Sequence, residues 1–198
     1  MKQLAIAVLI AMPASILAQP AQLPDYHTKG FWLGLHANAT SWRLEQGNLD
    51  IDQTDSGGGA GFTLAYGISN LVSFFLNVDA ASISPEDNDS YTLGSADLGA
   101  RFSFGSGQSK LRPFVEAALS GAGAEFEREG PNIEVTGGGL GAGLGLVYFF
   151  SRQVGLDAGV DFVFGNLSSV KVGNVAVDPN IDAFTSRINV GIVWFPGK

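Results

Sequence analysis

Bulky apolar side chains alternate with small or polar ones along most of this 198-residue chain. In the stretch Val154–Phe164, Val, Leu, Ala and Phe fill the even positions, while glycines and aspartates fill the odd ones up to Val163. A period of two residues is typical of a β-strand whose two faces have different surroundings. The stretch Phe184–Trp194 repeats the pattern, interrupted at Ser186. The chain is therefore predicted to be all-β.

Eight segments of this kind follow one another, and their connections are alternately short and long. The predicted strands are 31–40, 60–68, 72–80, 92–104, 114–120, 139–150, 154–164 and 184–194. The short connections are typical of tight antiparallel hairpins. The predicted long loops are 45–58, 83–91, 125–136 and 165–182. This order predicts an antiparallel up-and-down meander with both chain ends on the side of the short turns.

The ionisable residues of these segments all lie on the face opposite the bulky apolar one. They are His36, Asp79, Asp97, Arg101, Glu116, Asp157, Asp161 and Arg187. The same face is rich in Gly, Ala and Ser, which suits the crowded inside of a closed barrel. The large apolar groups then face an apolar solvent, in which only closed barrels or helices satisfy their backbone. We therefore expect an eight-stranded antiparallel transmembrane β-barrel with a filled polar lumen.

The first residues indicate export. Lys2, the apolar run Leu4–Met12 and the small Ala18 are typical of a secretory signal peptide over residues 1–18. Residues 19–29 form a polar lead, and residues 30–198 form the barrel domain. For an exported chain the apolar solvent is the bacterial outer membrane, with both termini predicted to be periplasmic. Without cysteine, neither disulfides nor thiolate metal sites are expected.

Aromatic residues mark the two ends of the predicted barrel. Eight face outward near the short turns, namely Phe31, Tyr66, Phe74, Phe102, Phe104, Tyr148, Phe150 and Trp194. They predict a girdle at the periplasmic interface. The opposite rim has Phe162, Phe164 and Phe184, with Tyr91 and Phe126 at loop edges. Five inward-facing aromatics are predicted to close the periplasmic mouth: Trp32, Phe75, Phe114, Phe149 and Phe195.

Over residues 30–195 the chain resembles the OmpA-like family of small outer-membrane β-barrels. The resemblance rests on this architecture and on the phrases Gly30–Leu35, Arg112–Ala117 and Arg187–Phe195. It implies that the barrel-assembly machinery reads an insertion signal in the last strand. The residues that match this signal are Ile188, Val190, Ile192 and Trp194. The chain departs from the family's pattern because Phe195–Lys198 follow the final aromatic residue.

Five carboxylates and two arginines in the lumen admit two interpretations. One is an ion path or gate, and the other is a hydrogen-bonded plug. The plug is favoured because an eight-stranded barrel is only wide enough for side chains to fill. Acidic residues are also dense in the predicted loops, where they could bind Ca²⁺ or Mg²⁺ between lipopolysaccharide phosphates. Solvated loops are favoured because the spacing lacks the EF-hand pattern.

Three functions are compatible with this reading. The first is a structural or surface-interaction role through four acidic extracellular loops, without catalysis, cofactor or metal. The alternative is a narrow channel for small or hydrophobic solutes, as in OmpW-like relatives. A lipid-modifying enzyme is third, because the only histidines are His27 and His36 and the His-x-Ser pattern of the deacylase relatives is missing. A soluble carrier, suggested by the lipocalin-like Gly30-Phe31-Trp32, is opposed by the inward charges.

The expected partners follow from the membrane setting. They are outer-membrane lipid and lipopolysaccharide, the assembly machinery during insertion, and a possible surface ligand at the loops. The net charge of −8 argues against nucleic acid. The barrel is expected to be a monomer.

Overall fold

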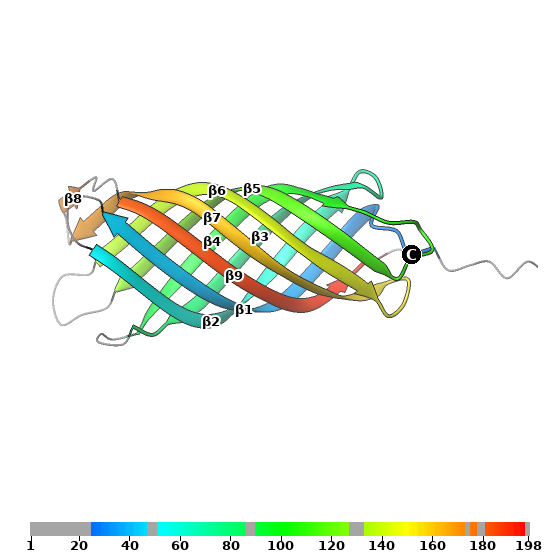
Figure 1. The fold of residues 1–198 in the computed structure, drawn as a ribbon, viewed down its shortest axis with the longest axis horizontal. Coiled ribbons are helices and arrows are strands. Elements are labelled where there is room, and N and C mark those ends of the chain that lie inside the picture. Colours follow the sequence, from blue (N-terminus) through cyan, green and yellow to red (C-terminus); the bar gives the residue numbers. More distant parts are fainter. Residues whose placement is uncertain are drawn as a thin grey trace, which may run out of the picture.

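The computed structural model describes residues 25–46, 51–85, 90–126, 133–172, 175–177 and 181–196. Eight long strands form one barrel (Figure 1). They are β1 (Gly30–Gln46), β2 (Ile51–Gly67), β3 (Val72–Ile83), β4 (Tyr91–Ser103), β5 (Leu111–Phe126), β6 (Ile133–Phe149), β7 (Val154–Val172) and β9 (Ile181–Trp194). The short strand β8 (Val175–Val177) pairs only with the end of β7. None of the described residues forms a helix long and apolar enough to span a membrane.

The barrel closes because its first and last strands pair. Each strand from β1 to β7 is antiparallel to its neighbour in the sequence, β9 pairs with β7, and β1 pairs with β9 from Leu33↔Trp194 to Glu45↔Asp182. Closure leaves no open sheet edge in the wall. The predicted eight-stranded antiparallel up-and-down barrel is confirmed.

Most of the predicted long loops were wrong, because the strands continue into them. Strand β1 runs to Gln46 and β2 begins at Ile51, so most of the predicted loop 45–58 is a hairpin. Strands β5, β6 and β7 extend in the same way into 125–136 and 165–182. Only the loop 83–91 has the predicted bounds. A membrane-spanning strand needs about 9–11 residues, whereas β1 has 17.

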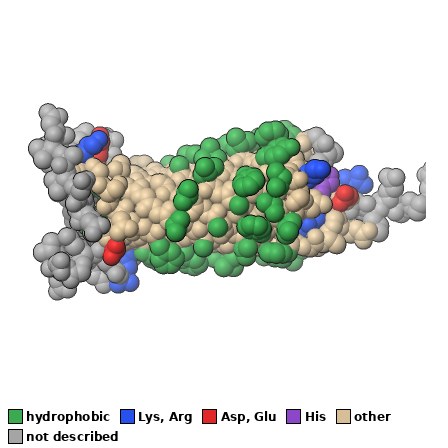
Figure 2. All heavy atoms as spheres, turned by 90° about the horizontal axis from the view of Figure 1, so that it is seen from above, with side chains coloured by type: hydrophobic (Ala, Val, Ile, Leu, Met, Phe, Trp, Pro, Cys, Tyr) green, Lys and Arg blue, Asp and Glu red, His purple; other side chains and the backbone are tan. Residues whose placement is uncertain are grey.

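The faces of the wall exchange their polarity along the strands, which explains this error. In β3 the outward side changes from Phe74, Leu76 and Val78 to Ser82, while the inward side changes from Asp79 to the apolar Ile83. Figure 2 shows the outer side of this exchange, with green apolar side chains in a band toward the short-turn end and mostly tan atoms beyond it. The part beyond the band carries a surface suited to water and an interior suited to an apolar core.

Two apolar clusters therefore fill the two ends of the interior. The first, which we call the short-turn plug, contains Tyr26, Trp32, Ala65, Phe75, Phe114, Val147, Phe149, Val193 and Phe195. The second, which we call the long-loop cap, contains Trp42, Ala81, Ile83, Tyr91, Leu93, Ala124, Val135 and Leu167. The polar side chains of the lumen lie between them.

Candidate functional site

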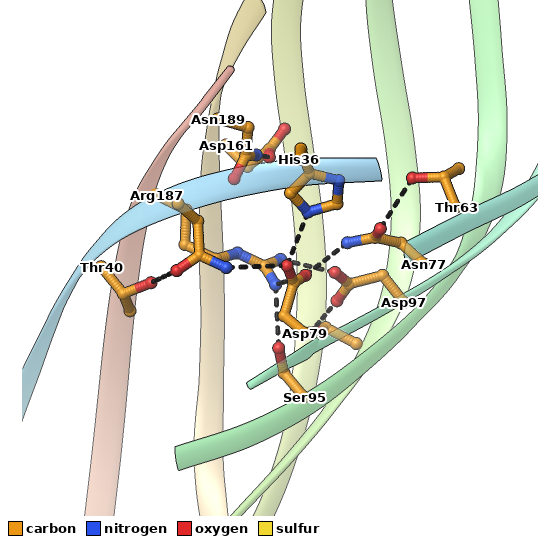
Figure 3. Close-up of polar contacts among 12 residues, drawn as sticks. His36, Thr40, Thr63, Asn77, Asp79, Ser95, Asp97, Asp161, Arg187 and Asn189 are labelled. Carbon is orange, nitrogen blue, oxygen red and sulfur yellow. Dashed lines mark hydrogen bonds and ion pairs between the residues drawn. The ribbon is translucent and has the colours of Figure 1, made fainter. Parts of the chain in front are cut away.

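Arg187 of β9 crosses the lumen and joins β3 to β4. Its Nη1 donates to Asp79 Oδ2 at 2.9 Å and to Ser95 Oγ at 2.9 Å, and its Nη2 donates to Asp97 Oδ2 at 2.5 Å (Figure 3). The side chain of Arg187 is 5% exposed. A buried charge of this kind is tolerated only when it is paired and hydrogen-bonded.

Asp79 has the most donors in this network. His36 Nε2 lies 2.7 Å from Asp79 Oδ1, and Asn38 Nδ2 donates to the same oxygen at 2.9 Å. Asn77 donates to the second oxygen, and its own amide oxygen accepts from Thr63 at 2.9 Å. Asp79 is thus bound by side chains from two other strands, β1 and β9, and from its own strand, which fixes the position of its carboxylate.

The inner face of β2 has no room for a side chain at Gly61. Gly61 of β2 lies between His36 on β1 and Asp79 on β3 in the strand register. A Cβ added at Gly61 would overlap both the Asp79 carboxylate and the His36 ring. The small residues on the inward face, which the sequence pattern picked out, therefore make room for the charged side chains.

Arg101 of β4 forms a second centre, closer to the short-turn plug. It donates to Glu116 on β5 and to Asp157 on β7, the latter at 2.5 Å. Its guanidinium also lies 3.8 Å from the centre of the Phe114 ring and 4.8 Å from that of Trp32. Cation–π contacts of this geometry are attractive. Arg101 therefore links the charged network to the aromatic plug.

All eight predicted network residues lie in the lumen, and all but Asp161 belong to the networks around the two arginines. Asp161, the remaining carboxylate, accepts from Asn189 on the neighbouring strand β9. Beside it lies a cavity of about 60 Å³, lined by residues that include Arg187, Glu116 and Asp161. A cavity of this size has room for a few water molecules. A smaller cavity of about 30 Å³ lies on the cap side and is also lined by Arg187.

The five aromatics predicted to close the mouth lie together in the short-turn plug. The ring centres of Trp32 and Phe195 are 5.9 Å apart, and those of Phe149 and Phe195 are 5.2 Å apart. One aromatic member of this plug, Tyr26, was not predicted from the sequence. It was assigned to a polar lead, yet it is 5% exposed and its ring centre lies 5.6 Å from that of Phe149.

Arg112 fastens this N-terminal segment to the barrel. It is 1% exposed and donates to the backbone oxygens of Tyr26 and Gly105, the second at 3.1 Å. Thr28 in turn donates to the backbone oxygen of Asn70 at 3.0 Å, in the turn between β2 and β3. Residues 25–29 are therefore part of the closed short-turn end. The only sequence signal was the aromatic Tyr26 within the lead.

The long-loop cap was also missed, and one prediction is corrected by it. Tyr91 was placed at the outer rim, but it faces the lumen with 7% exposure and packs against Trp42 at 6.3 Å between ring centres. Its hydroxyl donates to Asp55 at 3.0 Å. Burial and the nearby Asp55 carboxylate raise the pKa of the Tyr91 hydroxyl above its usual value, so it remains a donor. The side chain of Phe126 lies outside the described residues.

The outward face carries the predicted girdle and the residues of the proposed insertion signal. All eight girdle aromatics are exposed, from Phe102 at 38% to Phe31 at 58%. Ile188, Val190, Ile192 and Trp194 are 47–59% exposed on the same outer face. Their position suits contact with lipid or with an assembly factor, while their role as a signal remains a prediction.

The described residues provide no metal site. No group of three or more His, Cys, Asp or Glu side chains among them could hold a metal ion. His36 is engaged with Asp79 inside the lumen rather than facing lipid.

Comparison with known proteins identifies the family. A family model described as the outer membrane protein beta-barrel domain matches residues 4–193. The chain belongs to this family. Membership places the barrel in the outer membrane and agrees with its apolar belt. No curated protein sequence matches the chain.

Solved structures show the same fold at low sequence identity. Neisserial surface protein A is 21% identical, with 82% of this barrel and 96% of that chain covered and a TM-score of 0.60. OprG from Pseudomonas aeruginosa is 11% identical, with 85% of this barrel and 96% of that chain covered and a TM-score of 0.55. Ail, the attachment invasion locus protein of Yersinia pestis, was solved with the heparin analogue sucrose octasulfate. It is 12% identical, with 83% of this barrel and 99% of that chain covered and a TM-score of 0.52. At these identities the likeness concerns the fold alone.

Proposed function

We propose that the protein is a closed outer-membrane barrel that acts at the cell surface through its long-loop end, without catalysis. The observation that carries the proposal is the closure of the lumen at both ends. The short-turn plug and the long-loop cap are apolar, and Arg187 separates the two small cavities between them. A hydrated solute path would have to break all three barriers.

The part of the barrel beyond the apolar belt supports the surface role. The cap residues are at most 8% exposed, so this part has a core of its own. The connections between its strands therefore start from a packed, rigid end of the barrel. Ail, whose name describes attachment, shows that this fold is compatible with such a role. Because the loop sequences here are acidic, a cationic or neutral surface ligand is favoured over a polysulfated one.

The orientation belongs to the same proposal. Both termini and the short turns are periplasmic, and the long connections face the outside with lipopolysaccharide around them. An epitope inserted at residues 86–89 should be detected by antibody on intact cells, whereas one inserted at 106–109 should be detected only after permeabilisation. The reverse result would overturn this orientation. Insertion by the assembly machinery and a monomeric state complete the proposal.

Planar-bilayer recording tests the closed lumen. The purified protein should produce no stepwise current, and a porin-like conductance would replace this proposal with the channel. Mass spectrometry of lipid A from cells with and without the protein tests the absence of catalysis. Identical lipid A is expected, and a modified species that disappears with the protein would assign an enzyme.

A further inference from the structure

Charged residues are sorted between the two ends of the barrel. At the short-turn end, Lys29, Lys110 and Arg152 are all exposed and form no ion pair with another described residue. Asp25 is the one carboxylate in the described part of this end, and it forms no ion pair with any of the three. The sequences of the long connections are instead predominantly acidic. Among the described residues, three exposed positive charges at this end thus have no ion-pair partner.

These three cations adjoin the edge of the lipid-facing girdle in the sequence. Lys29 is two residues before Phe31, Lys110 directly precedes Leu111, and Arg152 is two residues after Phe150. The apolar neighbours are 58%, 48% and 55% exposed, respectively. Long cationic side chains in such positions keep their apolar stems along the wall and their charges at the headgroups.

The turn between β2 and β3 shows that this end does not project far into water. It contains Ile68 and Leu71, which are 53% and 49% exposed although they lie in the turn itself. Exposed apolar side chains at a turn are suited to the interface between lipid and water. Figure 2 shows the blue spheres at this end directly beyond the green band.

We propose that Lys29, Lys110 and Arg152 form a basic collar that binds the phosphates of anionic phospholipids in the adjacent leaflet. The cations come from the start of β1, the turn before β5 and the turn before β7, so they are spread around the barrel. A ring of lipid headgroups meets all three at once, whereas one compact ligand would meet only one. Each cation near an anionic surface is worth about 1 kcal/mol, or about fivefold in local lipid preference.

Trp194 provides a reporter for this collar. It is 47% exposed in the girdle, on the strand that pairs with β1. The other two tryptophans, Trp32 and Trp42, are 2% and 4% exposed inside the barrel. Brominated phospholipids in contact with the wall should therefore quench Trp194 alone. Since both leaflets of a simple vesicle have the same lipids, the result does not depend on the direction of insertion.

The experiment compares two sets of vesicles made of phosphatidylcholine with a minority of phosphatidylglycerol, in which one or the other lipid is brominated. The full barrel should show phosphatidylglycerol enriched about fivefold beside Trp194, and salt should reduce this enrichment. The variant K29Q/K110Q/R152Q should bring the ratio close to one. The control R43Q/K171Q removes two cations from the opposite end and should leave the ratio unchanged.

Equal quenching by the two lipids in the unmodified barrel would overturn the proposal, and so would an unchanged ratio in the triple variant. Competition by soluble peptidoglycan fragments would assign the collar to the cell wall instead and would also overturn it. The heat-dependent gel shift checks that each variant is folded. If the triple variant is not, the single variants K29Q and R152Q replace it, because Lys29 and Arg152 precede the two strands that pair with β9 at Trp194, and each should lower the ratio. The collar does not depend on whether the lumen conducts.

Discussion

Removal of the Arg187 guanidinium should destabilise the barrel strongly, because it leaves two buried carboxylates without their counter-charge. The two carboxylates differ in the number of hydrogen-bond donors that remain. Asp79 keeps three side-chain donors without it, from His36, Asn38 and Asn77. Asp97 keeps only Ser120 among the described side chains. In Arg187→Met the uncompensated charge therefore falls mainly on Asp97.

The size of the effect follows from this difference. Loss of one partner from a buried ion pair costs about 3–5 kcal/mol, because the other charge is left buried and unpaired. Asp97→Asn alone should cost about 1–3 kcal/mol, since Arg187 keeps Asp79 and Ser95. In the Arg187→Met background the same change removes the unpaired charge. The double variant should thus be more stable than Arg187→Met alone, by about 1–2 kcal/mol.

Reversible urea unfolding in phospholipid vesicles, followed by tryptophan fluorescence, measures these free energies. Lys171→Met serves as the control, because Lys171 is half exposed and lies 3.6 Å from Glu134, so its loss should cost no more than about 1 kcal/mol. The reasoning would be refuted by an Arg187→Met barrel as stable as the control. A double variant less stable than Arg187→Met would also refute it, because it would show that Asp97 does not carry the unpaired charge.

Three further substitutions can be measured by the same titration. Tyr26→Ala should lower the free energy of unfolding by about 3 kcal/mol and increase proteolysis near residue 26, because the buried ring holds the N-terminal segment in the plug; unchanged proteolysis would argue against this anchoring. Gly61→Val should cost at least about 1–3 kcal/mol, whereas Gly94→Ala, whose added methyl meets no atom closer than 3.8 Å, should cost less than about 1 kcal/mol. Equal losses at the two glycines would contradict the close packing around Gly61. Tyr91→Phe removes the bond to Asp55 and should cost about 1 kcal/mol, with no change in bilayer current.

Within the apolar belt, the alternation of side chains was sufficient to predict the wall and the residues that face its lumen. A one-residue slip would move Asp97 and Arg101 to the lipid side. Arg or Lys at the centre of the lipid face costs about 2–4 kcal/mol, so the inward register is strongly favoured. The apolar surroundings therefore require the same alternation in every strand, and this alternation is visible in the sequence without knowledge of the strand pairing.

The partners within the lumen could not be predicted in this way. Arg187 is on β9, yet it binds Asp79 on β3 and Asp97 on β4, which are not its neighbours in the sheet. Which side chains meet across a barrel depends on the stagger of the strands and on the space inside. Tyr26 was missed for a related reason. It precedes the first strand, so no alternation surrounds it.

The long-loop cap shows how the same period can be present and still be misread. Trp42 has the inward parity of His36, and Tyr91 has that of Asp97, so the direction of both side chains was available in the sequence. Tyr91 was assigned to a loop and Trp42 fell beyond the end of the first predicted strand, because above the apolar belt the bulky residues lie on the inward face instead of the outward one. A period of two specifies only that the two faces differ. The solvent decides which face is apolar.

The exchange of polarity also separates two requirements within one continuous wall. Inside the belt the outer surface must be apolar, so the interior is filled by small residues and paired charges. Above the belt the outer surface is free to be polar, so an apolar core becomes possible, and the cap forms there without any break in the pairing of β3 with β4 or of β1 with β2. Because the cap and not the membrane holds this part together, the connections that it carries can change in sequence without altering the lipid-facing surface. Variation in a surface ligand is therefore separable from insertion and stability, which is the arrangement expected of a barrel whose function resides in its loops.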